Sequence, residues 1–198
     1  PEKPAYKVDM PNIPVEAGQF ETHIKDMESR RPVKPENEAR IIWNDDSLKN
    51  KTEYAVVYLH GFSASQEEGD PVHQDFAKKF GCNLYLARLA EHGLDTADVL
   101  INLTADNYWE SAKQALAIGK QIGEKVILMG TSTGGTQALQ LAAAYPNDIA
   151  ALVLMSPNIE INDPAAWALN NHWGLQLARL VKKGDYNMAS DQRDIYKK

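Results

Sequence analysis

Cysteine pairs and metal-binding spacings are missing from this sequence. The chain of 198 residues contains a single cysteine, Cys82, so it cannot form an internal disulfide and is not a disulfide-stabilised scaffold. Its five histidines show no His-x-x-x-His spacing, and no Cys-x-x-Cys pair occurs. Because metal sites usually depend on such clusters, we expect no metal site and no cofactor.

Long apolar runs and an excess of positive charge are also missing. The clearest apolar runs have the length of strands, far below the ~20 residues that a membrane span requires. Hydrophobic residues make up 43% of the chain and charged residues 24%, which is typical of a soluble globular protein. Lysine and arginine number 21 against 27 acidic residues, giving a net charge of −6, so we expect no nucleic-acid partner. Localisation is left open, because the chain begins at Pro1 and a preceding signal or anchor would not be visible.

The chain divides by composition into three parts. Only one of them is long enough to form a domain with its own hydrophobic core. Residues 1–37 contain six of the ten prolines, which predicts an extended arm with one short helix around Glu21–Ser29. Residues 38–157 predict the globular core. Residues 158–198 predict a helical cap followed by a polar tail.

Between residues 38 and 157, apolar strand-like segments alternate with amphipathic helical segments. Thr104 is placed to cap a long helix that ends near Ile122, and Pro146 would stop a later helix. Alternation of this kind predicts an α/β fold with a mostly parallel sheet and helices on both faces. The expected strands are 39–43, 53–59, 83–87, 125–129 and 150–155, and the expected helices are 71–80, 104–122 and 134–145.

The most informative segment is a G-x-S-x-G motif formed by Gly130, Ser132 and Gly134. It lies directly after a predicted buried strand and directly before a predicted helix, which is the context of a nucleophile elbow. Such a turn would force the serine into a strained conformation and project its Oγ, and side chains at the flanking glycines would collide. We therefore predict that Ser132 is a nucleophile; the alternative is a turn hydroxyl in a glycine-rich loop.

A second motif, His60-Gly61-Phe62, follows the buried strand that ends at Leu59. Together the two motifs resemble the α/β-hydrolase fold, in which a His-Gly pair after the third strand begins the loop that supplies one oxyanion-hole N–H. The resemblance implies that the backbone N–H groups of Phe62 and Thr133 are the oxyanion-hole donors. It also implies that His60 braces the loop, with a role as general base as the alternative. Gly61 would let the loop approach the site closely.

A third likeness is the turn Glu91-His92-Gly93, where members of the family often carry Gly-His-Gly. We interpret His92 as a structural turn residue. The chain looks most similar to monoglyceride-lipase and lysophospholipase-like carboxylesterases, whose helical cap is inserted after the strand that corresponds to residues 150–155. Two predicted helices between Asp163 and Val181 match that position.

The acid and the base of a serine triad are not evident in the sequence. In this fold the chain order is serine, acid, histidine, and the only histidine after Ser132 is His172. It lies between the predicted cap helices and is a weak candidate for the base. We find no candidate after Pro157 for the two further strands that precede the acid and base loops in the family. The sequence therefore indicates the N-terminal part of a longer protein, with the acid and the base outside this chain.

Two classes of function fit these motifs. The first is a serine hydrolase that cleaves esters of small or lipid-like acyl groups through an acyl-enzyme on Ser132, with a thioesterase or peptidase of the same fold as an alternative. The second is a catalytically incomplete binding module on a degenerate hydrolase scaffold. Expected partners are the ester substrate and a second copy of the chain or its missing C-terminal segment, because residues 150–155 would form an unpaired edge strand. The expected acyl pocket is lined by Trp167, Trp173, Leu175 and Leu177.

Overall fold

The computed structural model describes residues 4–13, 19–160, 171 and 173–182. It divides into two units, Pro1–Ile159 and Glu160–Lys198, each of which is described by itself. In the second unit the structure describes one helix, α6 (Gly174–Lys182), where the sequence predicted the second cap helix. The first predicted cap helix lies outside the described residues. No helix in the described ranges is both long and apolar enough to cross a membrane.

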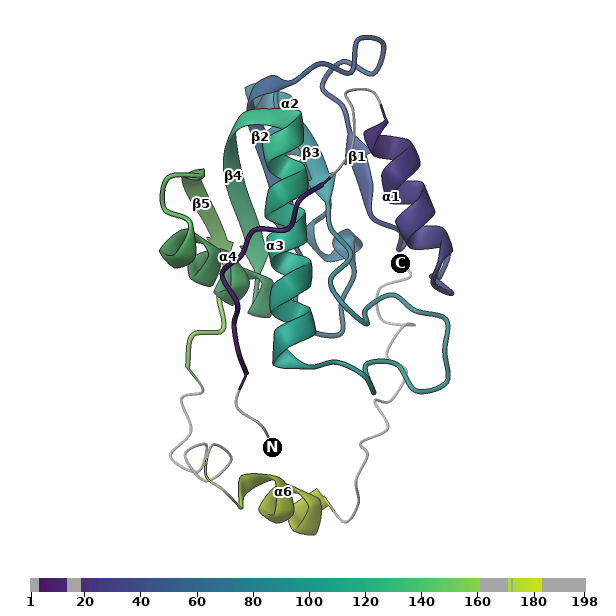
Figure 1. Ribbon diagram of the computed structural model, residues 1–198, viewed down its shortest axis with the longest axis vertical. Coiled ribbons are helices and arrows are strands. Elements are labelled where there is room, and N and C mark those ends of the chain that lie inside the picture. Colours follow the sequence, from purple (N-terminus) through teal and green to yellow (C-terminus); the bar gives the residue numbers. More distant parts are fainter. Residues whose placement is uncertain (1–3, 14–18, 161–170, 172, 183–198) are drawn as a thin grey trace. The chain divides into compact units, whose positions relative to one another are not determined.

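The first unit is built on a five-stranded sheet with the order β1-β3-β2-β4-β5 (Figure 1). The strands β2 (Thr52–Leu59), β3 (Asn83–Leu86), β4 (Gly123–Thr131) and β5 (Ile149–Met155) run parallel, which confirms the mostly parallel sheet. One edge strand, β1 (Arg40–Ile42), pairs antiparallel with β3. Within the described residues β5 pairs with β4 alone. The carboxyl ends of the parallel strands therefore meet at one end of the sheet, where ligands bind in open α/β sheets.

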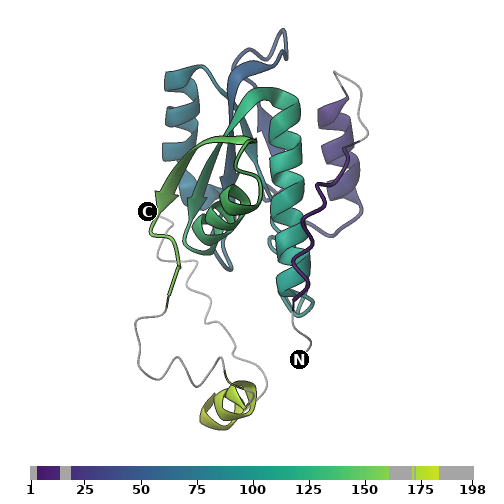
Figure 2. The ribbon, with the colours of Figure 1, turned by 60° about the vertical axis from the view of Figure 1, so that its left-hand side comes forward.

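Helices cover both faces of this sheet, as Figure 2 shows. Buried residues of α1, α3 and α4 form one apolar cluster with the sheet, and α2 contributes to a second cluster on the opposite face. Neighbouring residues of β2, such as Val56 and Val57, belong to different clusters, which explains why this strand is a continuous apolar run. The helices are α1 (Phe20–Ser29), α2 (Val72–Phe80), α3 (Ala105–Ile122) and α4 (Thr133–Ala144).

The ends of the long helix α3 follow from local chemistry. The Thr104 hydroxyl accepts a hydrogen bond from the Asn107 N–H at 3.1 Å, and the Asn107 side chain accepts one from the Thr104 N–H at 2.9 Å. This reciprocal pair is a capping box, and it confirms Thr104 as the N-cap residue of α3. The helix α4 ends at Ala144, two residues before Pro146, as the sequence predicted.

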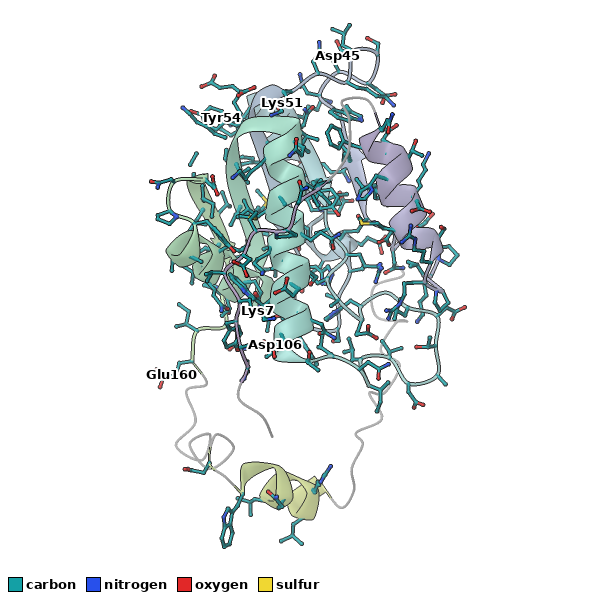
Figure 3. All side chains as sticks on the ribbon, viewed as in Figure 1. Lys7, Asp45, Lys51, Tyr54, Asp106 and Glu160 are labelled. Atoms are coloured by element: carbon teal, nitrogen blue, oxygen red, sulfur yellow. The ribbon has the colours of Figure 1, made fainter. Side chains whose placement is uncertain are left out.

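The N-terminal arm is packed against the core along its described residues. The Lys7 carbonyl accepts a hydrogen bond from the Trp109 indole at 2.8 Å, and the Asp9 carbonyl accepts one from the Lys113 ammonium at 2.9 Å. Figure 3 shows Lys7 and Asp106 near each other at the first turn of α3. Residues 4–13 are therefore attached to α3, and they belong to the same unit as the sheet, Pro1–Ile159.

The helix α1 also belongs to the core and is tied to the turn after β3. Its Phe20 and Ile24 are buried, with 8% and 2% of their surface exposed. Its Glu28 carboxylate forms an ion pair with the Arg88 guanidinium at 2.6 Å. Arg88 in turn donates a hydrogen bond to the His92 carbonyl at 3.2 Å. The N-terminal segment therefore braces a loop at the carboxyl end of the sheet.

Candidate active site

Ser132 occupies the sharp turn between β4 and α4. Its backbone has φ 51° and ψ −117°, a region that a non-glycine residue adopts at a cost of about 1–3 kcal/mol. The surrounding chain holds this conformation: the Ser132 N–H donates to the Met155 carbonyl at 2.9 Å, and the Ser132 carbonyl accepts from the N–H of Asn158 at 3.0 Å. The strain predicted for an elbow is thus present, and β5 and the residues after it maintain it.

The flanking glycines allow the strand and the helix to approach each other closely. A Cβ on Gly130 would lie 2.6 Å from the carbonyl oxygen of Gly134, and a Cβ on Gly134 would lie 2.1 Å from the carbonyl oxygen of Leu59. Both distances are far shorter than any real contact. Thr133 follows as the first residue of α4, where its N–H has no partner within the helix.

The loop after β2 lies directly beside this elbow. A Cβ on Gly61 would lie 3.3 Å from the Cβ of Ser132. The Gly61 carbonyl accepts the Ala64 N–H at 3.3 Å and lies 2.9 Å from His60 Nδ1. Because the Gly61–Phe62 peptide is trans, the Phe62 N–H points away from that carbonyl. This N–H donates no hydrogen bond within the described residues, so it is free for another acceptor.

His60 is held by both of its ring nitrogens. Its Nε2 accepts the Leu89 N–H at 3.1 Å, so the ring proton is on Nδ1 and is donated to the Gly61 carbonyl at 2.9 Å. Burial lowers the pKa of His60 to about 3. A general base needs a nitrogen lone pair that faces the nucleophile, and the only lone pair of this ring is occupied. The arrangement therefore favours the bracing role over the general-base role.

The buried side chains of His92 and Tyr108 also pack next to this site. The His92 ring is 1% exposed, lies 2.7 Å from the Ala90 carbonyl through Nδ1, and stacks on Tyr108 with 5.6 Å between ring centroids. Burial lowers the pKa of His92. The Tyr108 hydroxyl lies 3.2 Å from the Thr133 hydroxyl. Sequence reasoning missed Tyr108, because the contact joins α3 to the elbow and only the tertiary fold reveals it.

A second residue that sequence reasoning missed is Glu68, in a short 3₁₀ helix (Gln66–Gly69). Its Oε2 accepts the N–H of Gly61 at 2.7 Å and the hydroxyl of Tyr58 at 3.4 Å. The same hydroxyl lies 3.0 Å from the Thr131 hydroxyl. Burial, and more weakly the charge of Glu68, raise the pKa of Tyr58 to about 12. No sequence motif distinguishes this glutamate from its neighbour Glu67, which is the same residue type in the same sequence context.

The other predicted pocket residues belong to the second unit, which is described by itself. His172 and Trp167 lie outside the described residues, and Trp173 and Leu177 are 78% and 45% exposed. A pocket of about 480 Å³ lies at the amino ends of the strands, lined by Lys51 and Tyr54 among others (Figure 3), at the opposite end of the sheet from Ser132. Within the described ranges no three or more His, Cys, Asp or Glu side chains could hold a metal ion together.

The sheet order, the helices on both faces and the strained serine between β4 and α4 define an α/β hydrolase. The family model described as serine aminopeptidase, S33, matches residues 50–197, and the chain belongs to this family. No curated protein sequence matches the chain.

Solved structures agree with this fold assignment. A structure of the metagenome-derived lipolytic enzymes LipS and LipT is 21% identical, with a TM-score of 0.59, and the match covers 71% of this chain and 54% of that one. A hypothetical protein of Pseudomonas aeruginosa is 22% identical with a TM-score of 0.51, covering 79% and 52%. A protein of Mycobacterium tuberculosis is 16% identical with a TM-score of 0.52, covering 79% and 50%. The chain thus spans about half the length of these structures.

Proposed function

We propose that this chain carries the nucleophile and oxyanion loop of a serine hydrolase that cleaves carboxylic esters of small or lipid-like acyl groups. The observation that carries the proposal is the strained backbone of Ser132, at φ 51°, held between β4 and α4 with Gly61 beside it. A strained serine that the surrounding structure maintains is a frequent feature of catalytic sites. The similarity to a lipolytic enzyme supports the choice of esters.

The proposed reaction is acyl transfer through Ser132. The Oγ attacks the ester carbonyl carbon while a base takes its proton, and a tetrahedral oxyanion forms. The oxyanion collapses, the bond to the alcohol oxygen breaks, and the alcohol leaves with the proton. Water then gives a proton to the same base and attacks the acyl-enzyme, which releases the acid and restores the serine.

The backbone N–H groups of Phe62 and Thr133 are the proposed oxyanion donors. Both belong to segments next to Ser132, and neither donates a hydrogen bond within the described residues. His60 orients the Phe62 N–H by holding the Gly61 carbonyl on the opposite side of the peptide. Loss of one such donor costs about 10²–10³ in kcat in a known serine hydrolase.

The base and its orienting acid are assigned to residues that the structure does not describe. Among the described histidines, His60 and His92 are buried and engaged in the loops behind the site. We propose a histidine as the base and a carboxylate as the acid, as acyl transfer at serine requires. His172 remains a weak candidate for the base.

Replacement of the nucleophile tests the proposal. In the full-length protein, Ser132→Ala should abolish hydrolysis of short p-nitrophenyl esters, by on the order of 10⁶ in kcat, and should abolish covalent labelling by a fluorophosphonate. Ser156→Ala is the matched control, because Ser156 also directly follows a strand and has a positive φ of 46°. Retained labelling or hydrolysis in Ser132→Ala would refute the assignment.

Two other functions are separated by the same assays. The family description favours a peptidase as the second candidate, since amides and esters react through the same acyl-enzyme. Release of p-nitroaniline from aminoacyl anilides, with p-nitrophenyl esters inert, would favour the peptidase. A non-catalytic binding module would show neither labelling nor turnover of either substrate.

A further inference from the structure

Glu68 places a carboxylate next to the nucleophile. The position that a Gly61 Cβ would occupy lies 2.9 and 3.1 Å from the two carboxylate oxygens and 3.3 Å from the Cβ of Ser132. The Gly61 N–H holds the carboxylate there through a hydrogen bond of 2.7 Å. Glu68 and Ser132 therefore flank the same point of the loop, from two different elements.

The charge of this carboxylate is not cancelled by a cation within the described residues. Its hydrogen-bond donors, the Gly61 N–H and the Tyr58 hydroxyl, are neutral, and no ion pair of the described residues includes Glu68. Burial first, and then the charge of Glu68, raise the pKa of Tyr108. Because the Tyr108 hydroxyl contacts Thr133, the field of Glu68 reaches the residue that follows the nucleophile.

We propose that Glu68 sets a charge preference in the candidate site: it favours esters that carry a cationic group near the reacting carbonyl and disfavours esters that carry a carboxylate or phosphate there. This inference rests on the proposed function. Glu68 is exposed, so the interaction with a substrate charge is partly screened by solvent. We expect a ratio of about tenfold in kcat/KM between cationic and anionic esters, which decreases as salt is added.

Three esters with the same acyl group measure this preference in the full-length protein. They are the choline ester, its uncharged 3,3-dimethylbutyl isostere, and an ester of an alcohol that carries a carboxylate. The variant Glu68→Gln removes the charge and keeps an oxygen that can accept the Gly61 N–H. Glu67→Gln is the matched control, because it removes the same charge from the neighbouring residue, whose side chain makes no hydrogen bond or ion pair in the described part of the chain.

The wild-type protein should hydrolyse the choline ester about ten times more efficiently than the anionic ester at low salt. In Glu68→Gln this ratio should fall close to one, with kcat/KM for the neutral ester measured as the reference for any general change in activity. Glu67→Gln should keep the wild-type ratio. Raising the salt from about 50 to about 500 mM should reduce the ratio in the wild type and leave it unchanged in Glu68→Gln.

Other outcomes overturn the inference in distinguishable ways. Equal rates on the charged esters in the wild type, or an unchanged ratio in Glu68→Gln, would reject the charge preference while hydrolysis of the neutral ester sustained the proposed function. Loss of all three activities in a folded Glu68→Gln would make Glu68 part of the reaction machinery instead. Absence of any ester hydrolysis and of fluorophosphonate labelling in the wild type would reject the proposed function and this inference together.

Discussion

Gly134→Ala is the substitution that most directly tests how the elbow is built. The added Cβ would lie 2.1 Å from the Leu59 carbonyl oxygen and 2.5 Å from that of His60. Both neighbours are backbone atoms at the end of β2, so neither can rotate away. Ordinary contact begins at 3.4 Å, and α4 must therefore separate from β2 by roughly 1 Å.

The cost of this separation follows from two opposing effects. Overpacking of a core costs about 1–3 kcal/mol, and the upper end applies because backbone atoms are displaced. Alanine in a helix recovers about 1 kcal/mol relative to glycine. We expect a net loss of about 2 kcal/mol in the free energy of unfolding and a loss of about 100-fold in kcat, since a displacement near 1 Å misplaces Ser132 relative to the loop after β2.

Gly135→Ala is the control, because it gains the same helix propensity one residue later. Its Cβ would lie 3.0 Å from the Cβ of Pro157 and 3.2 Å from the Gly130 carbonyl oxygen. These neighbours need to move by only a few tenths of an ångström, so we expect a change within about 1 kcal/mol. Urea unfolding should show a midpoint about 1 M lower for Gly134→Ala than for the wild type. Equal midpoints and equal ester hydrolysis in Gly134→Ala and the wild type would refute the packing of the elbow described above.

Three further predictions concern the stability and association of the fold. The folded pKa of His60 is about 3, below its ordinary 6.5. Its contribution to the free energy of unfolding is therefore full above pH 6.5 and falls as the pH drops towards 3, by about 2 kcal/mol at pH 5. Urea unfolding of His60→Gln should lack this part of the pH dependence. An unchanged slope of the free energy of unfolding against pH in His60→Gln would contradict the prediction. Arg88→Met should destabilise by about 3 kcal/mol, because it leaves the buried Glu28 carboxylate unpaired. Arg30→Met, which breaks the exposed pair with Asp26, should cost less than about 1 kcal/mol, and equal melting temperatures of the two variants would count against this reasoning. The 198-residue chain on its own should associate in light scattering, because the described part of β5 pairs on one side only; a monodisperse monomer would reject this expectation.

The order of strands and helices could be predicted because each element has a local signal. The apolar run of β2 is buried on both faces, Thr104 caps α3, and Pro146 follows the end of α4. The antiparallel direction of β1 had no such signal, since an apolar segment such as 40–42 carries no information on the direction of its neighbour. The strained turn at Ser132 was predictable because its glycines, serine and flanking elements are contiguous in sequence.

The residues that the sequence did not reveal act through contacts between distant segments. Glu68 reaches Gly61 only because the 3₁₀ helix folds back over the loop. The composition of the arm gives no sign of its attachment to the core, where the backbone carbonyls of Lys7 and Asp9 accept hydrogen bonds from side chains of α3. Backbone acceptors are identical in every residue, so such attachments leave no mark in composition.

The hydrogen bonds that hold Ser132 have a consequence for the order of events during synthesis on the ribosome. Its N–H donates to the Met155 carbonyl, and its carbonyl accepts from the Asn158 N–H as well as from the Thr136 N–H of α4. Met155 and Asn158 are translated more than twenty residues after the serine. Until they emerge, these two hydrogen bonds cannot offset the cost of a positive φ, and we expect the nascent chain to keep the serine in a relaxed turn. We therefore expect Ser132 to acquire its strained geometry only when β5 has joined the sheet.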